Sequence, residues 1–81
     1  MNDRELMLRI LRHVASLEPI LGKNGRPLGA RMHLAKLAGI DRSMVTLIEC
    51  GARRMGAIVG SRLAQAFPEF ADDVAKVLIS R

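Results

Sequence analysis

Apolar residues recur every three or four positions along most of this 81-residue chain, which is the spacing of one face of an α-helix. The first run of such positions is formed by Leu6, Ile10, Val14 and Leu17. On this basis we predict a helix over residues 2–17, with Asn2 or Asp3 as its N-cap. Pro19 ends this helix, because the residue before a proline is pushed out of the helical region.

The same spacing predicts four further helices. We place them over residues 27–38, from 41 or 42 to 50, over 57–66, and from Pro68 onward. Asp41 is a good N-cap for the third helix, and Gly51 suits the left-handed position that follows its end. Gly22 and Asn24-Gly25 mark turns in the connector over residues 20–26, which has room for one more helical turn. Together these elements predict a single all-α domain over residues 1–81.

The composition suits a helical globular domain and argues against an enzyme. Apolar residues make up 49% of the chain, enough to form a core. Cys50 is the one cysteine, which excludes an internal disulfide and a cysteine zinc site. His13 and His33 have no acids or cysteines at ligand spacing, and the sequence holds no Ser/His/Asp set and no phosphate-binding glycine loop. We therefore expect no catalysis, cofactor, metal or small-molecule ligand.

Neither a membrane-spanning segment nor a secretion signal is visible in the sequence. No apolar run approaches the roughly 20 residues that cross a bilayer. The first residues carry acids and lack an apolar signal core. We expect a cytoplasmic protein with no membrane partner.

The net charge of +5 is unevenly distributed along the chain. The segment from Lys23 to Arg62 contains eight basic residues and only two acids, so it carries a charge of +6 and the remainder carries −1. Arginine outnumbers lysine ten to three, which favours bidentate recognition of phosphate or guanine. This cluster is typical of a surface that binds a polyanion. An ordinary solvated basic surface is the alternative.

Residues 34–51 form the most informative stretch, because two short helices meet there at Gly39. Two helices joined by a tight glycine turn are typical of a DNA-reading helix-turn-helix. In the second helix Val45 and Ile48 share an apolar face, and the other face carries Arg42, Ser43, Thr46 and Leu47.

The exposed face of that second helix supplies the candidate base contacts. Arg42 can reach guanine O6 and N7, worth about 1–3 kcal/mol of discrimination, or it can clamp a phosphate or remain a plain surface arginine. Ser43 and Thr46 can bond to a base edge or a phosphate, and Leu47 can pack on a thymine methyl. If the helix were rotated, Met44 and Leu47 would instead belong to the core. In the connector, Lys23 and Arg26 are either phosphate contacts or solvated charges.

A set of residues in this region resembles the Cro/lambda-repressor-type (XRE-like) helix-turn-helix family. The matching positions are Leu34-Ala35, Gly39-Ile40, Arg42-Ser43, Val45, Ile48-Glu49, Gly51 and Arg53. The resemblance extends over about residues 28–67. It implies a compact five-helix lambda-repressor-like domain, with a helix-turn-helix core over about residues 28–51.

The resemblance also implies roles for individual side chains. The Arg42 face would enter the major groove, while Arg31, Arg53 and Arg54 would contact the DNA backbone. Glu49 would form a structural ion pair with an arginine of the first helix, Arg12 in the first place and Arg9 in the second. Two positions depart from the family pattern, because Ala30 replaces a capping Ser or Thr, at about 1 kcal/mol, and Arg31 replaces glutamine.

These observations predict a transcriptional regulator that binds double-stranded DNA, most simply a dimeric repressor on a palindromic operator. One such module reads few base pairs, so two copies are expected. We predict the homodimer interface in the last helix, supported by Ile58 and Val59, at Phe70, Val74, Val77 and Leu78. The alternative is that this helix closes the core. An antitoxin or other protein-interaction module of the same fold, with DNA binding secondary, is the competing function.

Overall fold

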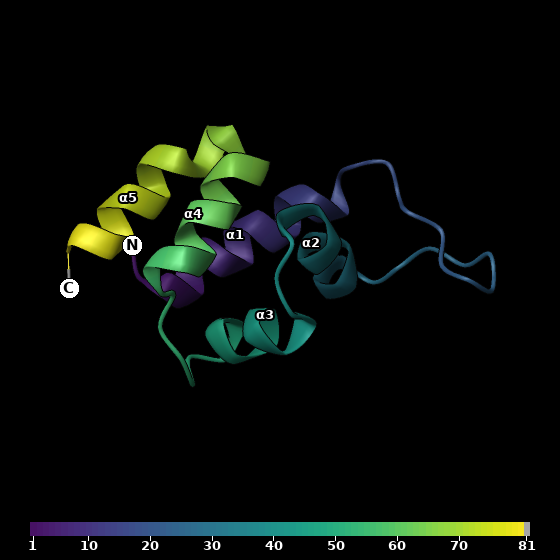
Figure 1. Ribbon diagram of the computed structural model, residues 1–81, viewed down its shortest axis with the longest axis horizontal. Coiled ribbons are helices and arrows are strands. Elements are labelled where there is room, and N and C mark those ends of the chain that lie inside the picture. Colours follow the sequence, from purple (N-terminus) through teal and green to yellow (C-terminus); the bar gives the residue numbers. More distant parts are fainter. Residues whose placement is uncertain (81) are drawn as a thin grey trace.

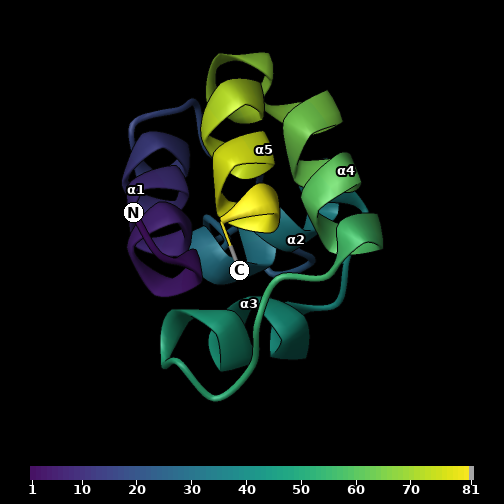
Figure 2. The ribbon, with the colours of Figure 1, turned by 90° about the vertical axis from the view of Figure 1, so that its left-hand side faces the viewer.

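The computed structural model describes residues 1–80, and its regular structure is helical (Figures 1 and 2). Within these residues lie five α-helices, with a short 3₁₀ helix, η1, at Pro68–Phe70 before the last of them. The α-helices are α1 (Asp3–Ala15), α2 (Ala30–Ala38), α3 (Arg42–Glu49), α4 (Ala57–Ala66) and α5 (Ala71–Ile79). No β-strand is present in residues 1–80 apart from one isolated bridge between Leu21 and Pro27. The prediction of an all-α fold is confirmed.

Several helix ends differ from the predicted ones: α1 ends at Ala15 and not at residue 17, and the last α-helix begins at Ala71 and not at Pro68, which starts the 3₁₀ helix η1. The Asn2 side chain caps α1 by accepting a hydrogen bond from the Glu5 N–H at 2.8 Å. α2 begins at Ala30 and not at residue 27, because the Leu28 N–H donates to the Ile20 carbonyl at 2.9 Å. That bond commits residues 27–28 to the connector.

The core lies around α1, which packs against α2, α3 and α5. Leu6, Met7 and Ile10 of α1 are completely buried, as are Leu34 of α2 and Ile48 of α3. α4 and α5 lie side by side, and Gly60 allows their close approach (Figure 2). A Cβ atom at Gly60 would lie 2.9 Å from Cδ1 of Leu78.

The predicted dimer interface on α5 is wrong at its two central residues. Val74 and Val77 are each only 2% exposed and belong to the core, while Phe70 and Leu78 are half-buried against it. α5 has one apolar stripe, which packs against α1 and α4. The stripe is therefore used inside the domain and is not available to a second copy. The apolar side chains that remain on the surface here are Ile58, 74% exposed, and Ile79, 81% exposed.

The connector between α1 and α2 is a protruding hairpin-like arm (Figure 1), and the extra helical turn considered for it is absent. We define the arm as residues 20–28. The Gly22 N–H donates to the Arg26 carbonyl at 2.7 Å, and the Gly25 N–H donates to the Gly22 carbonyl at 3.0 Å. Gly25 turns the chain with φ at 76°, a left-handed value that glycine adopts readily. The arm extends away from the helices along the longest axis of the molecule, which measures 41 Å.

Within residues 1–80, every helix is too short or too polar to cross a membrane.

Candidate functional site

A tight turn at Gly39 sets the direction of α3 relative to α2. Gly39 has φ at 70° and ψ at 37°, the left-handed conformation in which helices commonly end. The N–H groups of Gly39 and Ile40 both donate to the Ala35 carbonyl, at 2.9 and 3.0 Å. Asp41 occupies the N-cap position of α3 as predicted, although its side chain makes no capping hydrogen bond.

α3 has one buried face and one exposed face, as its apolar spacing predicts. Val45 and Ile48 are completely buried, whereas Arg42, Ser43, Thr46 and Leu47 are exposed, Leu47 at 39%. The hydroxyl of Thr46 donates to the Arg42 carbonyl at 3.3 Å. Of the two side chains that a rotated helix would bury, Leu47 stays outside and only Met44 is half-buried against the core.

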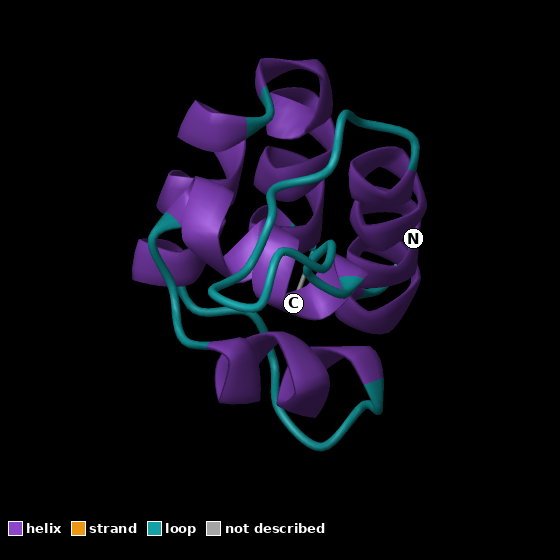
Figure 3. Cartoon of the chain, turned by 90° about the vertical axis from the view of Figure 1, so that its right-hand side faces the viewer, coloured by secondary structure: helices purple, strands orange, loops and turns teal. Residues whose placement is uncertain are grey.

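The exposed face of α3, the arm and the start of α2 together line a groove. The groove has a volume of about 760 Å³. Asn24 and Arg26 line it from the arm, and Gly29, Ala30 and Arg31 line it from the start of α2. Figure 3 views the molecule from the side of the arm, which crosses in front of the helices while α3 runs along the lower edge.

The groove gathers positive charge and hydrogen-bond donors, although one of its arginines, Arg31, is paired with Glu49 behind the lining. Arg26, Arg31 and Arg42 line it, and no aspartate or glutamate is among its lining residues within residues 1–80. The hydroxyls of Ser43 and Thr46 line it as well. This combination suits an extended anionic partner, because arginine and hydroxyl groups both bond to phosphate oxygens.

The structure thus brings together six of the predicted contact residues and leaves three outside the groove. The six are Arg42, Ser43, Thr46, Leu47, Arg26 and Arg31. Lys23 is exposed beside the groove, on the arm. Arg53 and Arg54 are exposed on the loop after α3. Asn24 was predicted only as a turn residue; it also lines the groove, and its Oδ1 accepts a hydrogen bond from the Arg26 N–H at 3.1 Å that shapes the arm.

The loop after α3 is fixed at both of its ends. The N–H groups of Ala52 and Arg53 donate to the Leu47 carbonyl at 2.9 and 3.2 Å. Met55 is completely buried, and its N–H donates to Oδ2 of Asp3 at 2.6 Å. These bonds hold the segment that carries Arg53 and Arg54 close to both α3 and the start of α1.

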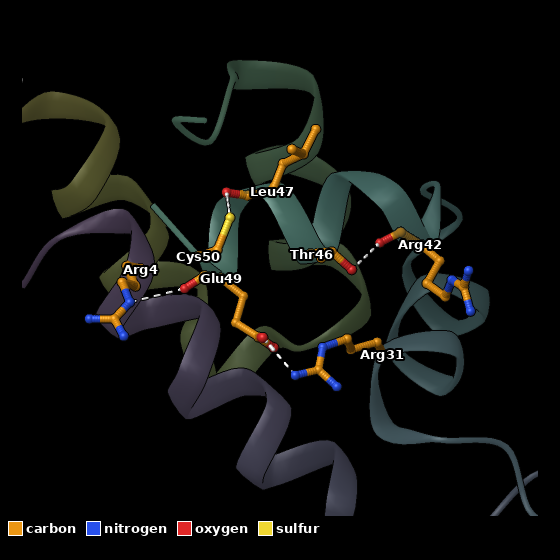
Figure 4. A network of polar contacts seen from close by, with 7 residues as sticks. All are labelled: Arg4, Arg31, Arg42, Thr46, Leu47, Glu49 and Cys50. Atoms are coloured by element: carbon orange, nitrogen blue, oxygen red, sulfur yellow. Dashed lines mark hydrogen bonds and ion pairs between the residues drawn. The ribbon is translucent and has the colours of Figure 1, made fainter. Parts of the chain in front are cut away.

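Glu49, at the end of α3, pairs with Arg31 and not with Arg12 (Figure 4). Its Oε1 lies 2.6 Å from Nη2 of Arg31, and its backbone carbonyl accepts a hydrogen bond from Nε of Arg4 at 3.0 Å. Arg12 lines a pocket of about 250 Å³ together with Arg31 and Glu49, but it forms no ion pair with Glu49. The predicted Glu49–Arg12 pair is therefore wrong, because the packing of α2 against α3 puts the first turn of α2 within reach of Glu49.

The ion pair favours the charged form of Arg31. A hydrogen bond from Arg31 to Glu49 and the attraction of the opposite charges both raise the pKa of Arg31 above its ordinary value. Arginine is protonated throughout the physiological pH range even without a partner, so the ion pair reinforces a charge that Arg31 already carries. The other carboxylate oxygen of Glu49, Oε2, is buried and has no hydrogen-bond partner in the described part of the chain.

His13 ties two helical segments together, whereas Cys50 makes only a local contact. Nε2 of His13 lies 2.6 Å from Oε1 of Glu69, and its ring meets Phe67 and Phe70 edge-on, which links α1 to η1. The Cys50 thiol donates to the Leu47 carbonyl at 3.4 Å. In residues 1–80 no three His, Cys, Asp or Glu side chains gather where they could hold a metal ion.

No family model, curated protein or solved structure matches this chain. The functional assignment therefore depends on the groove and its charge.

Proposed function

We propose that this chain is a sequence-specific regulator of transcription that binds double-stranded DNA in the cytoplasm. In this proposal α2 and α3 are a helix-turn-helix of the Cro/lambda-repressor type. The observation that carries it is the basic groove, because the four residues expected to read bases share one exposed face of α3 and meet two arginines there.

α3 would act as the recognition helix, since the major groove, about 12 Å wide, admits an α-helix. Arg42 stands at the first position of α3, where its guanidinium can form two hydrogen bonds to a guanine. Ser43 and Thr46 would bond to base edges or phosphates, and Leu47 would contact a thymine methyl.

The other basic residues would hold the DNA backbone. Arg31 borders both the groove and Glu49, so it would contact a phosphate in competition with that carboxylate. Arg53 and Arg54 would follow the backbone beyond the end of α3, and Lys23 and Arg26 would contact it from the arm. Each such contact adds affinity that decreases with salt concentration.

A second copy of the chain would complete the reading of a palindromic site. Ile58 and Ile79 are the exposed apolar side chains of α4 and α5, so they replace Val74 and Val77 as candidates for the two-fold contact. Repression would follow most simply from occlusion of a promoter. The same isoleucines favour the second candidate function, in which α4 and α5 bind another protein, as in an antitoxin, and DNA binding serves autoregulation.

Selection from a random duplex library tests the proposal. The protein should enrich one motif, with inverted half-sites about one helical turn apart if it is dimeric. Its affinity for the selected duplex should exceed that for random duplexes by about 10³-fold or more. Equal affinity for both, with no enriched motif, would contradict sequence-specific binding and favour the protein-interaction function.

A further inference from the structure

We propose that the arm is a second DNA-binding element, which enters the minor groove adjoining the major groove occupied by α3. This inference depends on the proposed function and extends it. A helix-turn-helix needs only a short connection between its domain's helices, so the length and shape of the arm call for a separate explanation.

The arm has a defined shape but little packing of its own. Its ribbon is closed by the Gly22–Arg26 and Leu28–Ile20 backbone hydrogen bonds. Residues 23–27 are nevertheless all exposed, and Leu21 is 62% exposed. An isolated two-stranded ribbon is marginally stable in water, and residues 23–27 gain no burial in this domain that would offset this. Its surface is free to meet a partner.

The charge of the arm and of the helix that follows it is of a single sign. Between Glu18 and Asp41 the chain contains four basic residues and no acid: Lys23, Arg26, Arg31 and Lys36. The side chains of Lys23 and Arg26 form no ion pair or hydrogen bond in the described residues. Both charges are therefore available to an anionic partner.

The position of the arm relative to α3 determines which part of a duplex it meets. Residues of α3 and of the arm line the same groove, so a DNA strand lying in it would contact both. In B-DNA a single sugar–phosphate strand separates the major groove from the adjoining minor groove. If α3 occupies the major groove, the arm lies over the minor groove.

The side chains of the arm suit that position. Arginine and lysine are attracted into the minor groove by its negative potential, which is strongest where A·T pairs make it narrow. Asn24 shapes the turn through its bond to the Arg26 N–H, which fixes the backbone from which the Arg26 side chain extends. We assign Arg26 the minor-groove contact and Lys23 a phosphate on its rim.

The test replaces base pairs that flank the motif selected by the unaltered protein. An inosine·cytosine pair presents the minor-groove face of A·T, because it lacks the guanine amino group, but the major-groove face of G·C. We expect the selected flank to be A·T, and its replacement by inosine·cytosine to change the affinity less than about twofold. Replacement by G·C should lower the affinity about tenfold. The difference should vanish in Arg26→Ala and persist in Arg9→Ala, which removes the same charge from α1.

Each other result is decisive. If inosine·cytosine weakens binding as much as G·C does, the flank is read from the major groove and the inference fails. If Arg26→Ala weakens binding equally on all flanks, Arg26 is only a phosphate contact and the inference also fails. A selected motif with no flanking preference overturns the inference while leaving the proposed function intact, whereas the absence of any motif overturns both. Because the Arg26 side chain supports no contact inside the domain, thermal unfolding of Arg26→Ala should match that of the unaltered protein.

Discussion

Nη2 of Arg31 lies 2.6 Å from Oε1 of Glu49, and this contact joins the first turn of α2 to the last turn of α3. Arg31 is exposed, whereas Glu49 is largely buried. The raised pKa of Arg31 means that its contribution to stability is present below its ordinary pKa and is lost only when the pH rises past the raised value. Unfolding measurements between about pH 6 and 9 should therefore show no change caused by Arg31.

Glu49→Gln should increase the affinity for random duplexes and steepen its salt dependence by about one unit of slope. The substitution keeps the shape of the side chain but removes a carboxylate that competes with phosphate for Arg31. Fluorescence anisotropy at several salt concentrations measures both quantities. Glu5→Gln removes the same charge from an exposed position of α1 and serves as the control. An equal effect in the control would show that net charge alone is responsible.

Arg42→Ala should weaken binding to the selected motif by about 1–3 kcal/mol, with a smaller effect on random duplexes. The reason is that a bidentate contact to guanine acts only where the guanine is present. Competition binding with the two kinds of duplex measures the difference. Equal losses on both would reassign Arg42 to a phosphate.

Arg53→Ala should make the salt dependence of binding shallower by about one unit of slope, because one phosphate contact is lost. Its sequence preference should remain that of the unaltered protein. The slope of log K against log salt is the measurement. An unchanged slope would remove Arg53 from the set of DNA contacts.

Ile58→Glu and Val77→Glu should behave in opposite ways. Val77 is buried, so a carboxylate there costs several kcal/mol and should unfold much of the protein. Ile58 is exposed, so Ile58→Glu should fold normally, with an unchanged midpoint of thermal unfolding. Sedimentation should then find the unaltered protein dimeric and Ile58→Glu monomeric. A dimer that survives Ile58→Glu would exclude this face as the interface.

The features that follow from local spacing could be predicted from the sequence. Val45 and Ile48 are three residues apart, so they lie on one face of any helix and leave Arg42 and Thr46 on another. Gly39 and Asn2 act through bonds to residues close by in the chain, and their roles as turn and N-cap follow from residue type.

The features that depend on packing between helices could not be predicted in this way. An apolar stripe such as that of Val74 and Val77 shows that a face is covered, but not whether by the same chain or a second copy. The partner of Glu49 depends on how α2 meets α3, which no local pattern encodes. The arm depends on the bond between Leu28 and Ile20, which are eight residues apart. The turn signals in the connector were equally compatible with an extra helical turn, so they did not predict the arm.

The two bonds from the start of α1 have a consequence for the thermodynamics of association. Arg4 holds the carbonyl of Glu49 at one end of the loop after α3, and Asp3 holds the N–H of Met55 at the other. α3 is a helix of only two turns, yet the chain that follows it is anchored before any ligand arrives. A preorganised helix loses little conformational entropy on binding, so more of its contact energy remains as affinity. Calorimetry should therefore find a smaller entropic penalty for the intact protein than for Asp3→Ala.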